Sequence, residues 1–126
     1  MIRKLAIFWG ILFLAVGLLG FVPNPIVGPN AYFDTDIAHN AAHILLGLVL
    51  VVMTRTDALA RNGLFIVGAI YLVLAILGFA TVGNEGQGHL LGLIHINGRD
   101  NWLHVVLALA LFGSALAHPR TRFEHA

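Results

Sequence analysis

Cysteine is absent from this chain of 126 residues. Without a thiol, the chain can form no disulfide, hold no metal through thiolates, attach no c-type haem and use no thiol nucleophile. Any metal or cofactor site must therefore be built without thiolate ligands.

Charged side chains are also scarce. The chain has seven Lys and Arg residues and six Asp and Glu residues, which is 10% of its length, and its formal net charge is +1. A soluble domain carries about 25% charged residues, and a chain this short exposes a large share of its surface. Because 59% of the residues are hydrophobic, we expect a lipid bilayer to be the solvent. The few basic residues are scattered, so we expect no nucleic-acid partner.

Four apolar runs approach the length that crosses a hydrocarbon core, for which about 20 residues suffice. Lipid-exposed backbone must satisfy its own hydrogen bonds as a helix or a closed barrel, and these runs are too long and too uniformly apolar for strands. The predicted fold class is all-α, an integral membrane four-helix bundle in a single domain, residues 1–126. Its helices are expected at about 5–22, 37–53, 64–82 and 101–117.

The basic residues predict how the helices are oriented, because cytoplasmic loops carry an excess of Lys and Arg. Arg99 stands alone on the outer side, near Tyr32 and Trp102, which fit an interfacial aromatic belt. The other six lie at the N-terminus, between the second and third runs and in the C-terminal tail: Arg3, Lys4, Arg55, Arg61, Arg120 and Arg122. We therefore expect a multi-pass protein of the cell (inner) membrane with both termini cytoplasmic.

An internal repeat relates residues of about 1–55 to residues of about 56–118. At an offset of 58, Leu19-Gly20-Phe21 matches Leu77-Gly78-Phe79, and at an offset of 61, Asn40-Ala41-Ala42-His43 matches Asn101-Trp102-Leu103-His104. The repeat predicts two tandem helical hairpins related by a pseudo-twofold along the membrane normal. It also argues that the first helix is part of the fold and not a cleaved signal. Small residues let helices approach closely, the role expected for Gly10, Gly17, Gly20, Gly47, Gly68 and Gly78.

Polar side chains near hydrocarbon are costly, and here they gather at the outer ends of the second and fourth runs and in the loop between: Asp36, His39, Asn40, His43, Glu85, His89, His95, Asp100, Asn101 and His104. His39 and His43 share one helical face, and Asp100 and His104 repeat that spacing. Three imidazoles and a carboxylate suit Zn²⁺, Cu²⁺ or a non-haem iron or manganese ion. The candidate metal ligands are therefore His39, His43, Asp100 and His104, while His43 and His104 alone could be the axial ligands of a haem.

The same residues also have a structural interpretation. Asp36 and Asp100 stand where helix N-caps are expected, and acidic groups are favourable at that end of a helix dipole. Asn40 and Asn101, together with the histidines, could hydrogen-bond across the second and fourth helices. Asp36, Asn40 and Asn101 would then form a structural polar cluster. A transporter or proton conduit is a third alternative, disfavoured because the inner halves of the four runs lack acidic, basic and histidine side chains.

The phrases His39-Asn40-Ala41-Ala42-His43-Ile44-Leu45-Leu46-Gly47 and Asp100-Asn101-Trp102-Leu103-His104-Val105-Val106 resemble a family of small bacterial membrane proteins known as domain of unknown function 4383. The resemblance covers nearly the whole chain. It implies four helices, with an Asn-x-x-His phrase opening the second and the fourth. It implies no activity.

We therefore expect a small membrane protein. The most specific hypothesis for its function is that an outward-facing His/Asn/Asp cluster binds a transition metal ion or a haem. The alternative is a non-catalytic structural or accessory membrane subunit. An enzyme is the least supported class, because no nucleophile–base pair is recognisable. The expected partner is the lipid bilayer, and the sequence leaves open a homo-oligomer or a larger membrane complex.

Overall fold

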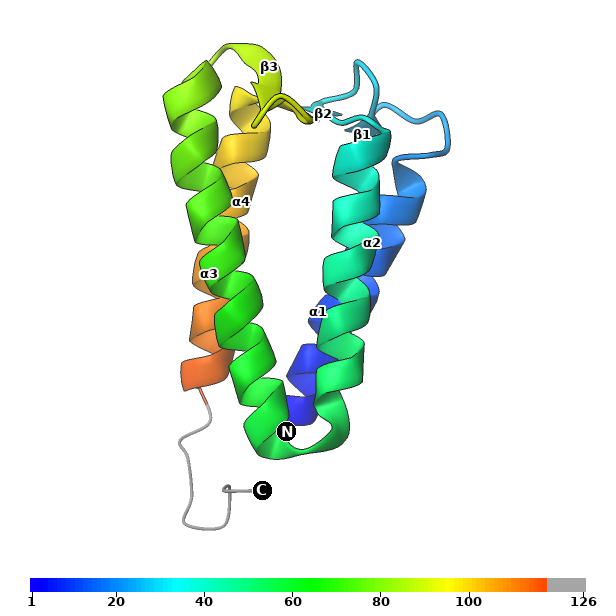
Figure 1. The fold of residues 1–126 in the computed structure, drawn as a ribbon. Helices are drawn as coiled ribbons and strands as arrows, with labels where there is room; N and C mark the ends of the chain where they lie inside the picture. Colours follow the sequence, from blue (N-terminus) through cyan, green and yellow to red (C-terminus); the bar gives the residue numbers. More distant parts are fainter. Residues whose placement is uncertain (118–126) are drawn as a thin grey trace.

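Four long helices dominate the computed structural model, which describes residues 1–117 (Figure 1). The helices are α1 (Ile2–Leu19), α2 (Ile37–Val52), α3 (Asp57–Val82) and α4 (Gly98–Leu116), and a short 3₁₀ helix η1 (Met53–Arg55) leads from α2 to α3. In Figure 1, α1 lies beside α2 and α3 beside α4, and these are the helix pairs that pack most closely.

Short strands gather at one end of the molecule, here called the strand end (Figure 1). Strands β1 (Val27–Gly28) and β2 (Phe33–Asp34) pair in parallel in the first connection. Strands β3 (Gln87–Leu90) and β4 (Ile94–Asn97) form an antiparallel hairpin in the second, with His89 opposite His95 and Leu90 opposite Ile94. These strands were not predicted, because neither connection carries a strand pattern long enough to recognise.

Helices α2, α3 and α4 begin where side chains cap them, and not only where the apolar runs begin. Thr56 Oγ1 accepts a hydrogen bond of 3.1 Å from the backbone N–H of Leu59, so α3 starts seven residues before the predicted residue 64. Arg61, predicted to lie in a loop, is therefore inside α3 and buried. Its guanidinium donates to the backbone carbonyl of Ala115 near the end of α4.

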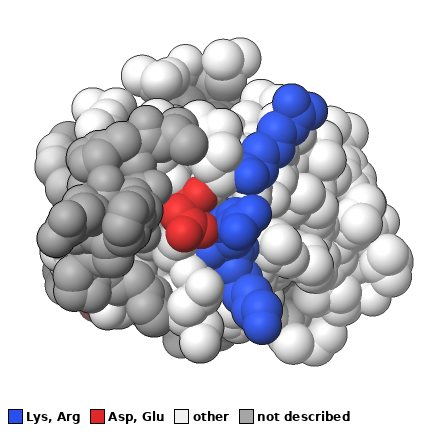
Figure 2. All heavy atoms as spheres, turned by 90° about the horizontal axis from the view of Figure 1, so that it is seen from below, with Lys and Arg blue, Asp and Glu red and all other residues white. Residues whose placement is uncertain are grey.

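The end opposite the strands is here called the basic end. It is defined by three basic residues, Arg3, Lys4 and Arg55, together with Asp57, which pairs with Arg3. Arg3 Nε lies 3.0 Å from the carboxylate of Asp57, and both side chains are about half exposed. Figure 2, which looks at this end from below, shows Lys and Arg atoms in a row with one acidic patch beside them. Residues 118–126 lie outside the described part of the chain. They include Arg120 and Arg122, two of the basic residues from which the cytoplasmic side was predicted.

Within residues 1–117, three helices are long and apolar enough to cross a membrane: Ile2–Leu19, Ile37–Arg55 and Asp57–Val82. Helix α4 is not among them, since its first turn carries Arg99 and Asp100. Large apolar side chains cover the outside of all four helices, including Phe8, Leu45 and Ile76, which are half or more exposed. An exterior this apolar is typical of a protein surrounded by lipid.

Glycines bring the paired helices together, as predicted. A Cβ atom added to Gly20 in the turn after α1 would collide with the side chain of Asn40 on α2, and one added to Gly78 on α3 would collide with that of Asn101 on α4. The buried Phe13 of α1 packs against Tyr71 of α3 at the centre, with ring centroids 5.2 Å apart. This contact joins the two helix pairs and lies next to the ring of His43.

Candidate functional site

Three buried imidazoles meet between the two helix pairs. His39 and His43 come from the first two turns of α2, and His104 comes from the second turn of α4. One nitrogen from each ring can be chosen so that all three lie within 4.8 Å of one another. The His39 ring stacks on that of His43 at 5.1 Å, and the His104 ring lies 5.6 Å from His39 and 6.1 Å from His43. None of the three residues is more than 5% exposed.

A backbone hydrogen bond holds the His39 ring. Its Nδ1 lies 2.9 Å from the carbonyl oxygen of His95 in β4. A carbonyl oxygen can only accept, so Nδ1 carries the proton, and the neutral ring then has its lone pair on Nε2. Metal-bound histidines commonly have this arrangement, in which the second ring nitrogen donates to a carbonyl or carboxylate that fixes the tautomer.

Tyr71 of α3 positions the other two rings. Its hydroxyl lies 3.0 Å from His43 Nδ1, and its ring centroid lies 5.2 Å from that of His104. His104 Nδ1 is buried and has no hydrogen-bond partner in the part of the chain that the structure describes. Because it has no partner among these residues, this nitrogen is available to bind an added ligand. Such a ligand would also remove the free-energy cost of a buried polar atom without a hydrogen bond.

A small cavity of about 20 Å³ adjoins the three rings. A water molecule needs about 10–15 Å³ on this measure, so the cavity has room for one water molecule or one ion. The remainder of its wall consists of Tyr71 and five apolar side chains: Ala42, Leu46, Leu74, Leu90 and Ile94.

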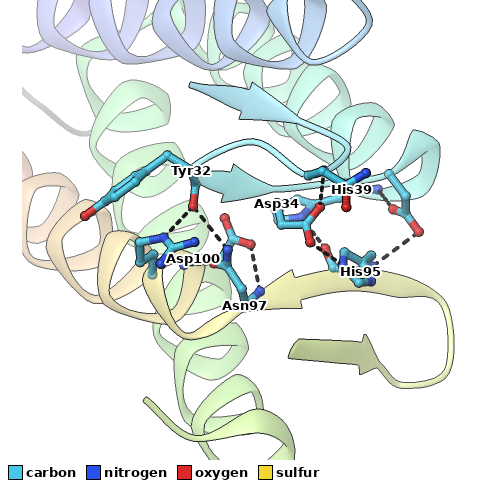
Figure 3. Close-up of polar contacts among 9 residues, drawn as sticks. Tyr32, Asp34, His39, His95, Asn97 and Asp100 are labelled. Carbon is cyan, nitrogen blue, oxygen red and sulfur yellow. Dashed lines mark hydrogen bonds and ion pairs between the residues drawn. The ribbon is translucent and has the colours of Figure 1, made fainter. Parts of the chain in front are cut away.

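The β3–β4 hairpin closes the cavity at the strand end. Leu90 and Ile94 supply its inner wall, and carboxylates hold the hairpin in place. Asp36, which caps α2, accepts a hydrogen bond of 3.3 Å from the backbone N–H of His95. The His95 ring lies 2.6 Å from a carboxylate oxygen of Asp34 in β2 (Figure 3).

Asp100, the fourth predicted metal ligand, is used differently. Its carboxylate accepts the backbone N–H of Asn97 at 2.9 Å, while the Asn97 side chain accepts the backbone N–H of Asp100 at 2.9 Å (Figure 3). This capping box makes Asn97 the N-cap of α4, so the prediction that Asp100 would be the N-cap is wrong, whereas Asp36 is the N-cap of α2 as expected. Among the described residues, His39, His43 and His104 form a group of three with ligand atoms close enough to share an ion, and Asp100 is not part of that group.

The two asparagines face glycines rather than histidines. Asn101 donates from Nδ2 to the carbonyl oxygen of Gly83 at 3.1 Å, which links α4 to the end of α3. The Asn40 side chain packs against Gly20. Neither Oδ1 atom has a hydrogen-bond partner among residues 1–117.

Sequence reasoning missed Tyr71 as a member of the site and did not foresee the role of His95. Tyr71 matches Phe13 at the repeat offset of 58. A hydroxyl-bearing ring in the third apolar run, at the position where the first run has phenylalanine, was a usable signal. The contact between His95 and His39 spans 56 residues, and no spacing rule predicts it.

Comparison with known proteins supports the family resemblance. No curated protein and no solved structure matches the chain. The model of the family described as "Domain of unknown function (DUF4383)" matches residues 3–117, which is nearly the whole chain and includes every residue of the site. The chain therefore belongs to the DUF4383 family.

Proposed function

We propose that this chain is a four-helix membrane protein that holds one transition metal ion between His39, His43 and His104. The observation that carries the proposal is the convergence of three buried imidazoles on one small cavity. Buried groups of this kind in a membrane protein are costly unless they are paired or bind something.

The distances suit a shared ion after a small movement. Zn²⁺ binds histidine nitrogen at about 2.0–2.1 Å in a tetrahedral arrangement, so its ligand nitrogens lie about 3.3–3.4 Å apart. The three nitrogens lie within 4.8 Å of one another, and rotation of the rings would bring them closer together around an ion. Three protein nitrogens would leave a fourth position for water, as in open zinc sites.

The donors favour zinc or copper. Imidazole suits Zn, Cu, Fe and Ni, whereas Mg, Ca and Mn prefer oxygen ligands, and Asp100 is occupied by its capping box. A haem between His43 and His104 does not fit, because the cavity of about 20 Å³ has no room for a porphyrin and the Tyr71 ring packs on both imidazoles.

Matched contacts in the two halves support the internal repeat. Phe13 and Tyr71 are 58 residues apart (71 − 13) and pack against each other, and His43 and His104 are 61 apart (104 − 43) and lie 6.1 Å apart. The two glycine–asparagine contacts follow the same offsets. We infer that the helix pairs are tandem hairpins around a pseudo-twofold axis, which would pass close to the site.

The placement of charge supports the proposed orientation. Basic residues at the basic end favour the cytoplasm for that end, and the half-exposed rings of Tyr32 and Trp102 at the strand end fit an aromatic belt. In this proposal α4 is the fourth span, with its polar first turn at the outer headgroups. The metal site then lies near the outer surface of the cell membrane.

Metal analysis of the purified protein tests the proposal. The full chain, without a polyhistidine tag, is purified in detergent, stripped with a chelator and titrated with Zn²⁺ and with Cu²⁺. We expect the unaltered chain to bind one equivalent of metal tightly. His43→Ala and His104→Ala should each abolish this tight binding. The control is His118→Ala, a histidine outside the described residues, which should keep it.

The titration also separates the main alternative. If the cluster is only structural, the unaltered chain binds no metal tightly, and His43→Ala lowers the thermal stability by about 0.6–2 kcal/mol for the lost interhelical bond to Tyr71. A wild-type chain without a tight equivalent would contradict the metal proposal. Should His43→Ala fail to fold, His43→Gln gives the same test with less change in volume.

A further inference from the structure

The β3–β4 hairpin has two chemically different faces. Successive side chains of a strand point to opposite faces of a sheet. Leu90 and Ile94, which form a cross-strand pair, line the buried cavity. The adjacent cross-strand pair is His89 and His95, which therefore lies on the face directed away from that cavity.

We propose that His89 and His95 form a second, exposed site for a divalent transition metal ion. Their ring centroids lie 4.9 Å apart, with the ring planes at 65°. His89 is exposed, and the His95 side chain is 21% exposed. Both rings are therefore accessible from water without any opening of the buried cavity.

Asp34 prepares His95 to act as a ligand. His95 Nε2 lies 2.6 Å from the Asp34 carboxylate, whose side chain is 8% exposed. Since an ionised carboxylate only accepts, Nε2 carries the proton and Nδ1 keeps the lone pair for a metal. A carboxylate behind a histidine fixes the tautomer and the orientation of the ring. This arrangement is visible in Figure 3, where the His95 ring is directed toward Asp34.

The His89 ring is exposed and lies beside the His95 ring. It has no hydrogen-bond partner among the residues that the structure describes, and it projects from a strand held in register by four residue pairs. Two imidazoles and water molecules would complete the shell of Zn²⁺, Cu²⁺ or Ni²⁺, for which imidazole is a suitable donor. With two protein ligands rather than three, this site should be the weaker of the two.

Titration of four related chains tests the second site independently of the buried one. The parent is the full chain with His118→Ala and His125→Ala, so that tail histidines do not contribute, and the probe is Zn²⁺ alone. We expect the parent to bind two equivalents, one tight and one weaker. His89→Ala should lose only the weaker equivalent, and Gln87→Ala, an exposed change on the same face of β3, should keep both. The double variant His43→Ala/His104→Ala should keep only the weaker one.

The stoichiometries distinguish the two proposals. The exposed site is supported if His89→Ala loses the weaker Zn²⁺ equivalent of the parent and Gln87→Ala keeps it. This holds even if no chain binds the tight equivalent, a result that would contradict only the buried-site proposal. If His89→Ala binds as much Zn²⁺ as the parent, or if Gln87→Ala loses the weaker equivalent to the same extent, the exposed site is overturned. Far-ultraviolet circular dichroism of each variant confirms that its helices are intact.

Discussion

Tyr71 of α3 contacts Phe13 of the other helix pair and also contacts two of the three imidazoles, those of His43 and His104. Its hydroxyl lies 3.0 Å from His43 Nδ1. If a metal occupies His43 Nε2, the Nδ1–H must donate, and the Tyr71 oxygen is the acceptor placed to receive it. The hydroxyl thus acts on the metal by orienting the ring that binds it.

Tyr71→Phe should therefore weaken metal binding without abolishing it. Loss of an outer-shell partner typically reduces metal affinity by about 10- to 100-fold, and we expect a reduction in this range, measured by competition with a chelator of known affinity. Tyr32→Phe is the matched control, because the Tyr32 hydroxyl makes no contact with the site. Equal affinities for Tyr71→Phe and wild type would contradict the orienting role.

At the residue scale, the sequence identified the three histidines for sound reasons. A spacing of four placed His39 and His43 on one face, and the repeat placed His104 at the depth of His43. The same logic also selected Asp100, which matches His39 at an offset of 61 and whose carboxylate accepts the backbone N–H of Asn97. A short carboxylate at the third position of a helix can reach back to the N-cap amide, an option that imidazole at the matching position does not take here.

The starts of α2, α3 and α4 are fixed by local hydrogen bonds that contribute to stability. Asp36, Thr56 and Asn97 each accept a backbone N–H in the first turn of their helix. Loss of a cap costs about 0.5–2 kcal/mol. Since Asp36 also holds the hairpin through His95, its cap is coupled to closure of the cavity.

Asp100→Ala separates a capping role from a ligand role. We expect it to lower the free energy of unfolding by about 1 kcal/mol through loss of half the capping box. The tight metal equivalent should be retained. Thermal unfolding followed by circular dichroism, combined with metal analysis, checks both parts. A stable Asp100→Ala protein that no longer binds metal would restore Asp100 as a ligand.

Close packing within a helix pair predicts a second stability effect. Gly78→Ala places a methyl group against the amide of Asn101, and overpacking of this kind typically costs about 1–3 kcal/mol. The midpoint of thermal unfolding should fall. Gly113→Ala, on the exposed face of α4 with open space around it, is the control and should not lower the midpoint. Equal midpoints for the two variants would contradict the packing account.

Among the elements, hydrophobic runs predicted four helices, and the described residues 1–117 contain four α-helices. The early start of α3 was missed because residues 57–63 are polar enough to read as a loop, although Thr56 and Asp57 supply a cap and an acidic first turn. The hairpin β3–β4 was missed for a different reason. Its strands are four residues each, and its position depends on contacts with Asp34, Asp36 and His39, which are distant in sequence.

The whole molecule is two helix pairs that meet along a seam of aromatic and imidazole rings. Phe13, Tyr71, His43 and His104 form this seam, and a hydrogen bond of 3.0 Å from Trp9 to Ser114 joins α1 to α4 nearer the basic end. A metal ion between α2 and α4 would add a link across the same seam. Binding to the folded form alone would then stabilise the whole chain by mass action.

The proposed orientation can be measured because the chain has no cysteine. Single cysteines are introduced at Gln87 near the strand end and at Asn62 near the basic end, both exposed. In intact cells, a membrane-impermeant thiol reagent should label Gln87→Cys and spare Asn62→Cys until the membrane is permeabilised. The reverse pattern would contradict the orientation, and labelling of both in intact cells would contradict a membrane-spanning arrangement.

X-ray absorption at the zinc edge tests the shared metal site most directly. The sample is the His89→Ala chain, with His118 and His125 also replaced by alanine, loaded with one equivalent of Zn²⁺ in detergent. We expect a first shell of about three imidazole nitrogens at about 2.0–2.1 Å, with outer-shell scattering from the rings. A first shell of oxygen atoms without imidazole scattering would show that the buried histidines do not hold the ion.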